Sequence, residues 1–290
     1  MIWWTLPFRR LREYLEMVRF SHTAFAMPFA FLAMVTAAQG WPDLRTFSFI
    51  LLCLVSVRTA AMAFNRIVDR HIDALNPRTR NRHLPRGSVS PAEAWLVFTT
   101  GAVIFVFSAY ELNRLAFLLS PVVLVVLCGY SYTKRFTSAS HFILGLCLAM
   151  APAGAWIAVL GALDPPVVFL AAGVLCWVAG FDIIYSLMDE EFDRTTGLHS
   201  LVVRLGRAGA LRVSGLLHVG SSLFVALFGY MTGLGMLFWM GWTVFSGALV
   251  YEHRLVHPED ISHVNAAFFN VNGTISILLF LFGAADVIWL

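Results

Sequence analysis

The chain has 290 residues, of which 59% are hydrophobic and 13% are charged, with a formal net charge of +3. A soluble domain carries about 25% charged residues, so this chain has too little polar surface to cover a globule in water. The composition excludes an ordinary water-soluble enzyme and a disordered chain. With a mean hydropathy of +0.76, it indicates a polytopic membrane protein.

Nine apolar segments are each long enough to cross a bilayer as a helix. They run over residues 21–39, 46–68, 92–111, 115–133, 141–161, 166–189, 208–232, 235–252 and 266–288. These segments lack the two-residue alternation of barrel strands, which disfavours a β-barrel. The sequence therefore predicts an all-α fold of nine transmembrane helices, forming a single domain over residues 1–290.

The basic residues predict the orientation of these helices. If the N-terminus is cytoplasmic, 17 of the 20 Lys and Arg residues fall on the cytoplasmic side, whereas Arg45 and Arg114 fall outside and Arg58 lies within a span. Cytoplasmic loops of membrane proteins are enriched in Lys and Arg. We therefore expect a protein of the inner (plasma) membrane with a cytoplasmic N-terminus and an uncleaved first span.

Other features of the sequence exclude several kinds of site. The four cysteines lie in apolar segments without a CxxC pair, so we expect no disulfide framework and no thiolate metal site. His253, His257 and His263 lack a pattern such as HExxH and are interpreted as cytoplasmic loop histidines. No glycine-rich phosphate loop occurs, and the basic clusters lack a soluble platform for nucleic acid.

The stretch Asn65-Arg-Ile-Val-Asp69-Arg-His-Ile-Asp73 ends the second apolar segment. Its amide and two carboxylates are spaced four residues apart and therefore share one helix face. Carboxylates so spaced repel each other unless a cation lies between them, and Mg²⁺ prefers oxygen ligands and substrate phosphate. By itself, this stretch could also be a solvated helix end.

A second stretch of the same kind lies at the inner end of the sixth segment. Asp182, Tyr185, Asp189 and Asp193 are spaced three, four and four residues apart, again on one predicted helix face. Asp182 follows a long apolar run, where a carboxylate is costly and is a functional candidate by default. Two such faces on different helices are the layout expected for metal ions that bridge an anionic substrate.

Basic residues follow the first Asp stretch in a loop rich in Pro and Gly, and Lys134 ends the fourth segment on the same side. Guanidinium and ammonium groups suit phosphate oxygens, so the arginines of this loop and Lys134 are candidate phosphate contacts, although topology alone also places charges here. Arg58 lies two turns deeper on the face of Asn65. It is a candidate for binding a substrate anion, with snorkelling as the alternative.

The predicted sites for phosphate and Mg²⁺ lie at the membrane boundary, next to a deep apolar helix bundle. This combination favours a substrate with a diphosphate head and a long hydrocarbon tail, such as a polyprenyl diphosphate. The 25 Phe and many small residues are able to shape a tail channel, although most of them serve lipid contact and helix packing. An ion-coupled transporter is a rival class, but transporter sites usually lie near the midplane at broken helices.

Together, the two Asp stretches resemble the UbiA superfamily of intramembrane aromatic prenyltransferases. The segment RTRNRHLPRG resembles the family's R-T-x-x-R-P-L-P-x-G, with His83 where the family usually has proline, and YSYTKRFT resembles a segment with a phosphate-binding lysine. The residues that match the family's NxxxDxxxD and DxxYxxxDxxxD patterns are Asn65, Asp69 and Asp73, then Asp182, Tyr185, Asp189 and Asp193.

The resemblance implies nine helices around a central cavity that opens to lipid, with Mg²⁺ held between the Asp motifs and the diphosphate. It assigns metal binding to Asn65, Asp69, Asp73, Asp189 and Asp193, and diphosphate contacts to Arg78, Arg82 and Lys134. It further implies that a ring carbon of an aromatic acid attacks an allylic cation, with Asp182 or Tyr185 orienting the acceptor or stabilising positive charge. The combination most resembles 4-hydroxybenzoate polyprenyltransferases of ubiquinone synthesis. A naphthoate acceptor of the futalosine menaquinone route stays open, and Arg58 would serve either acid.

Overall fold

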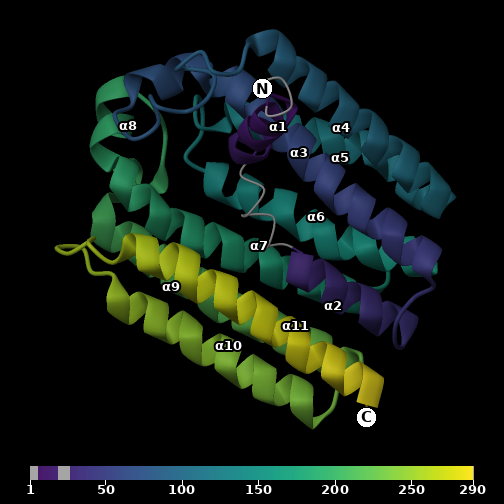
Figure 1. Ribbon diagram of the computed structural model, residues 1–290. Helices are drawn as coiled ribbons and strands as arrows, with labels where there is room; N and C mark the ends of the chain where they lie inside the picture. The colour runs from purple at the N-terminus through teal and green to yellow at the C-terminus, as the bar shows by residue number, and fades with distance from the viewer. Residues whose placement is uncertain (1–5, 19–26, 290) are drawn as a thin grey trace. The chain divides into compact units, whose positions relative to one another are not determined.

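A computed structural model describes residues 6–18 and 27–289, and every regular element in these two ranges is a helix (Figure 1). The chain divides into two compact units. The first comprises residues 1–23 and 48–132, and the second comprises residues 24–47 and 133–290. Residues 19–26, which include part of the first predicted span and Arg19, lie outside the described residues.

The first unit contains the helices α1 (Leu6–Met17), α4 (Pro91–Leu112), most of α3 (Leu44–Leu75) and nearly all of α5 (Arg114–Thr133). Helix α4 begins with a capping box, in which the Ser90 side chain accepts from the Glu93 backbone and the Glu93 side chain accepts from the Ser90 backbone. Helices α3 and α4 pack closely, since a Cβ atom on Gly101 would lie 2.9 Å from the Ser56 carbonyl oxygen. These features fix where the loop between α3 and α4 ends.

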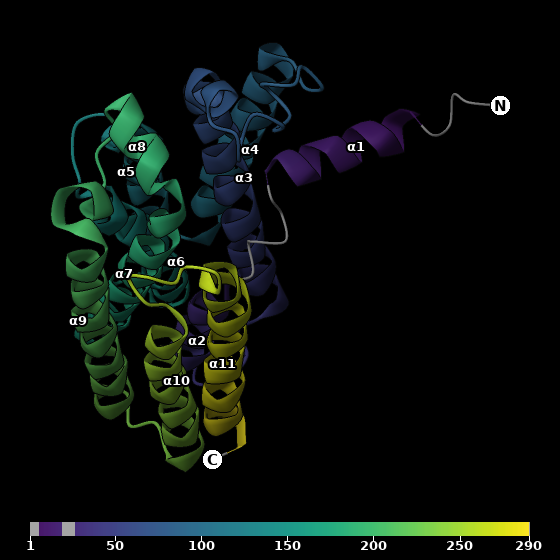
Figure 2. The same cartoon turned by 90° about the vertical axis from the view of Figure 1, so that its left-hand side faces the viewer.

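The second unit contains α2 (Met27–Ala38), α6 (Ser140–Leu160), α7 (Pro165–Ser186), η2 (Leu187–Asp189), α8 (Glu190–Thr196), α9 (Leu201–Met231), α10 (Met236–Leu255), the π-helical turn η3 (Ala266–Val271) and α11 (Asn272–Trp289). Helix α7 is central and packs against α6 and α9, while α10 packs along α11 (Figures 1 and 2). Trp177 of α7 is fully buried and lies 4.9 Å from the Phe29 ring, centroid to centroid.

Helix boundaries in the second unit follow local chemistry. Helix α6 ends at Leu160 and is followed by Gly161 in the left-handed conformation, and α7 begins with prolines after Asp164. Gly206 interrupts α9 with a φ of 69° and a ψ of 169°, which is non-helical. Residues 201–205 are therefore helical, although the sequence placed them in a loop before a span at 208–232.

One cap joins the last two helices. The Asp286 carboxylate on α11 accepts hydrogen bonds from the backbone N–H groups of Gly235, Leu237 and Phe238 at 2.5, 3.0 and 3.3 Å. The first N–H groups of a helix have no partner within it, so an acceptor at this position satisfies them and complements the helix dipole.

Each predicted apolar segment coincides with a helix in the described part of the chain. Seven of the described helices are long and apolar enough to span a membrane, and helix α2 is apolar but shorter. Helix α10, predicted as the eighth span, has 20 residues but is not among the seven. All four cysteines are free thiols.

Candidate functional site

The first Asp motif lies on consecutive turns of one helix, as predicted. Helix α3 continues without a break to Leu75 and carries Asn65, Asp69 and Asp73. The Asn65 amide Nδ2 donates to Asp69 Oδ2 at 2.8 Å and to Ser131 Oγ on α5 at 3.4 Å. Because the amide nitrogen faces these two acceptors, the carbonyl oxygen of Asn65 is left as the atom suited to a cation.

Asp73 is paired by an arginine from the loop that follows α3. Arg82 Nη1 donates to Asp73 Oδ1 at 2.7 Å, and the Thr79 hydroxyl donates to the Asp73 backbone carbonyl at 3.0 Å. Two atoms of the pair, Asp73 Oδ2 and Arg82 Nε, are buried and have no hydrogen-bond partner among the described residues. The carboxylate and the guanidinium thus each keep one interaction to offer a ligand.

Arg78 lies at the start of the same loop. Its backbone N–H donates to Asn76 Oδ1 at 2.9 Å, which fixes the turn that leaves α3. The Arg78 side chain is exposed. Arg78 is therefore accessible from solvent, whereas Arg82 is held beside Asp73.

Arg58 lies seven residues before Asn65 on α3, as predicted, and is half-buried. Its Nε is buried without a hydrogen-bond partner in the described ranges. A guanidinium is always charged and offers five donors, so an unpaired donor at this depth suits an anionic ligand. Its role in binding a substrate acid stays a prediction.

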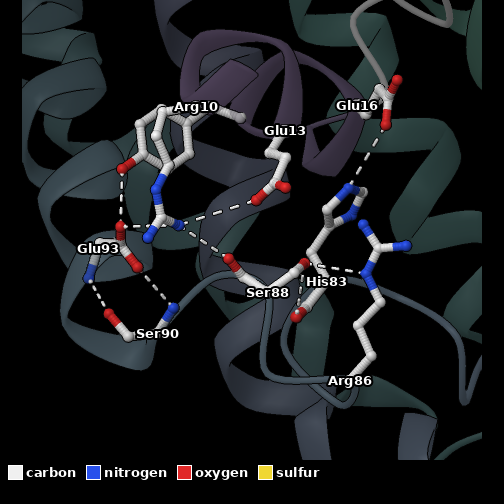
Figure 3. Close-up of polar contacts among 9 residues, drawn as sticks. Arg10, Glu13, Glu16, His83, Arg86, Ser88, Ser90 and Glu93 are labelled. Carbon is white, nitrogen blue, oxygen red and sulfur yellow. Dashed lines mark hydrogen bonds and ion pairs between the residues drawn. The ribbon is translucent and has the colours of Figure 1, made fainter. Parts of the chain in front are cut away.

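Helix α1 contacts the end of the loop that joins α3 to α4 (Figure 3). Arg10 Nη1 donates to the Ser88 carbonyl at 2.9 Å and lies 3.4 Å from Glu93 Oε1, which also accepts from the Tyr14 hydroxyl at 3.0 Å. Glu93 also belongs to the capping box with Ser90. Helix α1, the loop and the start of α4 therefore share one polar cluster.

His83, the departure from the family pattern, lies in this same cluster. Its Nε2 is 3.7 Å from Glu16 Oε2 on α1, and Arg86 Nε donates to Ser88 Oγ at 2.9 Å nearby (Figure 3). Burial and the positive charge of Arg86 lower the pKa of His83 below its usual value. The histidine therefore stays mostly neutral near pH 7. Its polar ring contacts Glu16 of α1, a contact that the apolar side chain of proline could not make.

The second Asp motif is not one continuous helix, contrary to the expectation. Asp182 and Tyr185 lie on α7, which ends at Ser186. Asp189 closes the 3₁₀ turn η2, and Asp193 lies on the separate helix α8. A new helix start places these acidic residues near a helix N-terminus, where negative charge is stabilised.

Asp193 is buried, and its Oδ2 has no hydrogen-bond partner in the part of the chain that is described. The Ser200 hydroxyl bonds its carboxylate, and Lys134 and Asp189 lie close enough to interact with it electrostatically. The Lys134 carbonyl oxygen accepts from the His199 backbone N–H at 2.8 Å. The predicted phosphate-binding lysine is thus tied by its backbone to the segment that contacts Asp193.

Asp182 has a partner that sequence reasoning missed. His141, at the start of α6, is fully buried, and its Nδ1 lies 2.7 Å from Asp182 Oδ2. The backbone N–H of Leu201 donates to the other ring nitrogen at 3.5 Å. The only sequence signal was a histidine at the edge of an apolar run, 41 residues from its partner.

Tyr185 packs against the π-helical turn η3. Its ring centroid is 4.2 Å from that of Phe268, with the two planes 34° apart. Phe268 also meets Phe181 edge-on at 5.2 Å. Because π-helical turns are uncommon and often mark functional sites, the contact between η3 and a motif residue supports a role for Tyr185.

Buried polar groups hold η3 in place. Asn272 Nδ2 donates to Glu252 Oε1 at 2.8 Å and to the Ala267 carbonyl at 3.1 Å, while its Oδ1 accepts from Trp177 Nε1 at 2.6 Å. We call Trp177, Asn272 and Glu252 the buried triad. The triad joins α7, α10 and α11 through a single, fully satisfied amide.

The interpretation of His253 as a loop histidine is wrong. His253 lies in the last turn of α10, and its Nε2 is 3.0 Å from Nδ1 of the buried His218 on α9. The sequence pattern could not show this, because the apolar segment was judged to end at residue 252. His257 and His263 are exposed in the segment after α10, as expected.

The carboxylates of both motifs suit Mg²⁺. Each motif contains a buried carboxylate oxygen without a hydrogen-bond partner in the described ranges, Asp73 Oδ2 and Asp193 Oδ2. No group of three His, Cys, Asp or Glu side chains within residues 6–18 and 27–289 forms a ready-made metal cage. Each of these carboxylates suits Mg²⁺, which is usually held by one or two carboxylates and completed by water and substrate phosphate.

Comparison with known proteins identifies the family. The profile of the UbiA prenyltransferase family matches residues 26–274. The chain belongs to the UbiA prenyltransferase family. Among curated relatives of this prenyltransferase, the 4-hydroxybenzoate octaprenyltransferase of Vibrio cholerae is 33% identical over 83% of this chain and 84% of its own length. The enzyme of the same description from Chromohalobacter salexigens is 30% identical over 82% and 80%.

Solved structures agree with the fold of this UbiA-family prenyltransferase. The apo structure of a UbiA homolog from Aeropyrum pernix has a TM-score of 0.83 and 32% identity, over 90% of this chain and 96% of that one. A UbiA homolog from Archaeoglobus fulgidus, solved with GPP and Mg²⁺, has a TM-score of 0.71 and 21% identity, over 95% and 99%. The protein is an all-helical, multi-pass membrane prenyltransferase.

Proposed function

We propose that this prenyltransferase transfers a polyprenyl group from a polyprenyl diphosphate to 4-hydroxybenzoate, in the manner of ubiquinone synthesis. Two curated relatives that bear this description are at least 30% identical over four fifths of the chain or more. A naphthoate acceptor of the futalosine menaquinone route is the second candidate, because Arg58 suits any aromatic acid. An ion-coupled transporter loses its support, since the family profile is that of a prenyltransferase.

The observation that carries the proposal is the pair of buried, unpartnered carboxylate oxygens, Asp73 Oδ2 and Asp193 Oδ2. A buried carboxylate with an open acceptor site is costly unless a cation completes it. We propose Mg²⁺ as that cation, held by Asn65, Asp69, Asp73, Asp189 and Asp193. When bound, Mg²⁺ neutralises charge on the diphosphate and so makes it a better leaving group.

The basic residues bind and orient the diphosphate. Arg82 keeps its Nε available while Nη1 holds Asp73, so it can bind phosphate and align the carboxylate at the same time. Arg78 reaches the phosphate oxygens from the exposed start of the loop. Lys134 supplies a further positive charge beside Asp193. Charge neutralisation at the leaving group lowers the barrier to breaking the C–O bond.

The reaction forms one carbon–carbon bond. The bond between the prenyl carbon and the diphosphate oxygen breaks, the diphosphate keeps the electron pair, and an allylic cation results. The ring carbon ortho to the phenol attacks this cation, then loses its proton, and aromaticity returns. Arg58 holds the acceptor carboxylate, while Asp182 or Tyr185 orients the ring or stabilises the cation. Apolar walls limit quenching by water.

The wider architecture belongs to the same proposal. We propose nine spans around a central cavity that opens to lipid, with residues 1–290 forming one catalytic domain in the inner membrane. The proposed N-terminus and active site face the cytoplasm. The charge distribution supports this orientation, because 17 of the 20 basic residues fall on one predicted side.

The test is an acceptor comparison in membranes that contain the full-length protein. Polyprenyl diphosphate and Mg²⁺ are supplied with 4-hydroxybenzoate or with 1,4-dihydroxy-6-naphthoate, and the prenylated product is measured by mass spectrometry. We expect product from 4-hydroxybenzoate and, from Asp69→Asn, a small fraction of it. Product from the naphthoate alone would assign the second candidate. No product from any aromatic acid with folded protein would overturn the proposal.

A further inference from the structure

We propose that His141 is a positioning residue that holds the Asp182 carboxylate in the orientation needed for the aromatic acceptor. This inference rests on the proposed function, since it concerns the acceptor half of that reaction. His141, the second residue of α6, has a side-chain exposure of 0%. Its Nδ1 lies 2.7 Å from Oδ2 of Asp182, whose side chain is 16% exposed. The pair therefore has one end in the core and one end open to a ligand.

The hydrogen-bond partners of the His141 ring assign its tautomer. The Leu201 backbone N–H donates to Nε2 at 3.5 Å, which assigns Nε2 as the acceptor. The proton of a neutral imidazole then lies on Nδ1, which donates to Asp182 Oδ2. Asp182 is thus held through one oxygen, and we assign its second oxygen to the contact with the acceptor phenol.

Fixing one oxygen matters because the terminal torsion of an aspartate is broad and weakly restrained by itself. A hydrogen bond from a fully buried ring restricts that rotation. The ring cannot follow Asp182, because it is packed in the first turn of α6 and bonded to the start of α9. The packing of α6 and α9 therefore fixes the His141 ring, and the ring in turn fixes the orientation of the Asp182 carboxylate.

His141 also couples the acceptor side to the phosphate side of the second unit. Ser200, the residue before Leu201, bonds the Asp193 carboxylate, and His199 is bonded to the Lys134 backbone. One short segment, residues 199–201, therefore contacts the candidate diphosphate residues and the positioning histidine. This arrangement orients the acceptor relative to the group that leaves, which is the requirement for attack on the allylic carbon.

The experiment compares variants of the full-length protein in membranes by steady-state kinetics, with Mg²⁺ present and with polyprenyl diphosphate and 4-hydroxybenzoate varied in turn. His141→Leu removes the donor but keeps an apolar side chain of similar bulk. His141→Asn keeps an N–H near the position of Nδ1. The control is His257→Leu, which removes an exposed histidine in the segment after α10.

We expect His141→Leu to lower kcat for 4-hydroxybenzoate by about 10- to 100-fold, the range for losing a hydrogen bond to a charged group, with the KM for the polyprenyl diphosphate unchanged. His141→Asn should recover most of this loss, and His257→Leu should match the wild type. In an Asp182→Asn background, His141→Leu should add little further loss, because both act through the same carboxylate.

Three results would overturn the role. His141→Leu with wild-type kcat would show that the pair does not serve the reaction. Equal losses in His141→Leu and His141→Asn, with the KM for both substrates rising together, would show a merely structural histidine. Full additivity with Asp182→Asn would show that the two residues act separately. A wild-type protein inactive with every acceptor would instead overturn the proposed function, an outcome visible before any variant is compared.

Discussion

Arg82 reaches back nine residues along the chain to place its Nη1 2.7 Å from Asp73 Oδ1. The contact joins a candidate metal ligand to a candidate phosphate ligand before any substrate is bound. The guanidinium keeps a buried Nε for a further acceptor, so the pair need not separate when an anion arrives. Substrate binding can therefore extend this contact instead of replacing it.

Arg82→Ala should lower kcat/KM for the polyprenyl diphosphate by about 10- to 100-fold, since the loss removes a charge-assisted hydrogen bond and the alignment of Asp73. Steady-state prenylation in membranes measures the effect. Arg80→Ala is the matched control, because Arg80 lies in the same loop and is exposed. Equal losses in the two variants would attribute the effect to the charge of the loop as a whole.

Asp73→Asn and Asp193→Asn should each lower kcat by at least about 100-fold, because each removes a buried negative charge needed to hold Mg²⁺ and the diphosphate. Chelation of Mg²⁺ should stop the wild type, and added Mg²⁺ should restore it. Glu191→Gln, an exposed carboxylate on α8, serves as the control and should stay near wild-type activity. Normal turnover of both aspartate variants would exclude these residues as metal ligands.

Gly145→Ala should destabilise the protein by about 1–3 kcal/mol, because small-to-large changes at a packed contact force backbone shifts. Its added Cβ would lie 2.4 Å from the Leu175 carbonyl oxygen, so α6 and α7 must separate. Gly154→Ala on the same helix meets nothing within 4 Å and should leave stability unchanged or raise it by up to about 1 kcal/mol. Melting temperatures in detergent compare the two.

Asn272→Ala should destabilise the protein by about 2–3 kcal/mol, because it leaves buried partners of the triad unpaired. Trp177 Nε1 loses its acceptor, and Glu252 Oε1 loses its donor. The same variant should weaken prenylation, since η3 and its contact between Phe268 and Tyr185 lose their anchor. Thermal unfolding and kcat measured on one preparation test both effects. An unchanged melting temperature would contradict the importance of the triad.

The stability of the folded protein should depend on pH through His83. Its pKa is lowered in the folded state by burial and then by Arg86, so the unfolded chain binds the proton more readily. Stability is therefore highest above the unfolded value of about 6.5 and falls as the pH drops below it. Relative to His83→Gln, the wild type should lose melting temperature between about pH 7.5 and 5.5, a range in which carboxylates such as Glu16 stay ionised. Parallel curves for the two proteins would contradict this sign.

Local patterns predicted the helices and the first motif well. The run from Asn65 to Asp73 follows the helix repeat, and nothing in the folded chain interrupts α3. The second motif obeys the same spacing, but its helix stops after Ser186 and restarts at Glu190. Spacing alone cannot reveal such a break, since neither glycine nor proline marks it.

Partnerships across long sequence distances were not predictable from the sequence. Asp182 follows a long apolar run and is therefore costly to place there, but nothing near it in the sequence pointed to His141. His253 was misjudged for the same reason, because its contact with His218 depends on how α9 and α10 pack. Arg82 was predicted as a phosphate contact, whereas its bond to Asp73 depends on the turn of the loop.

The cap that Asp286 places on α10 has a consequence for how the protein is made. The acceptor lies 51 residues after Gly235, whose N–H it satisfies, so α10 is synthesised well before its cap. Until then, the N–H groups at its start have no carboxylate partner, which is unfavourable in an apolar environment. Helices α10 and α11 are therefore expected to enter the bundle as a pair. Although α10 is translated first, its assembly then waits until α11 has been synthesised.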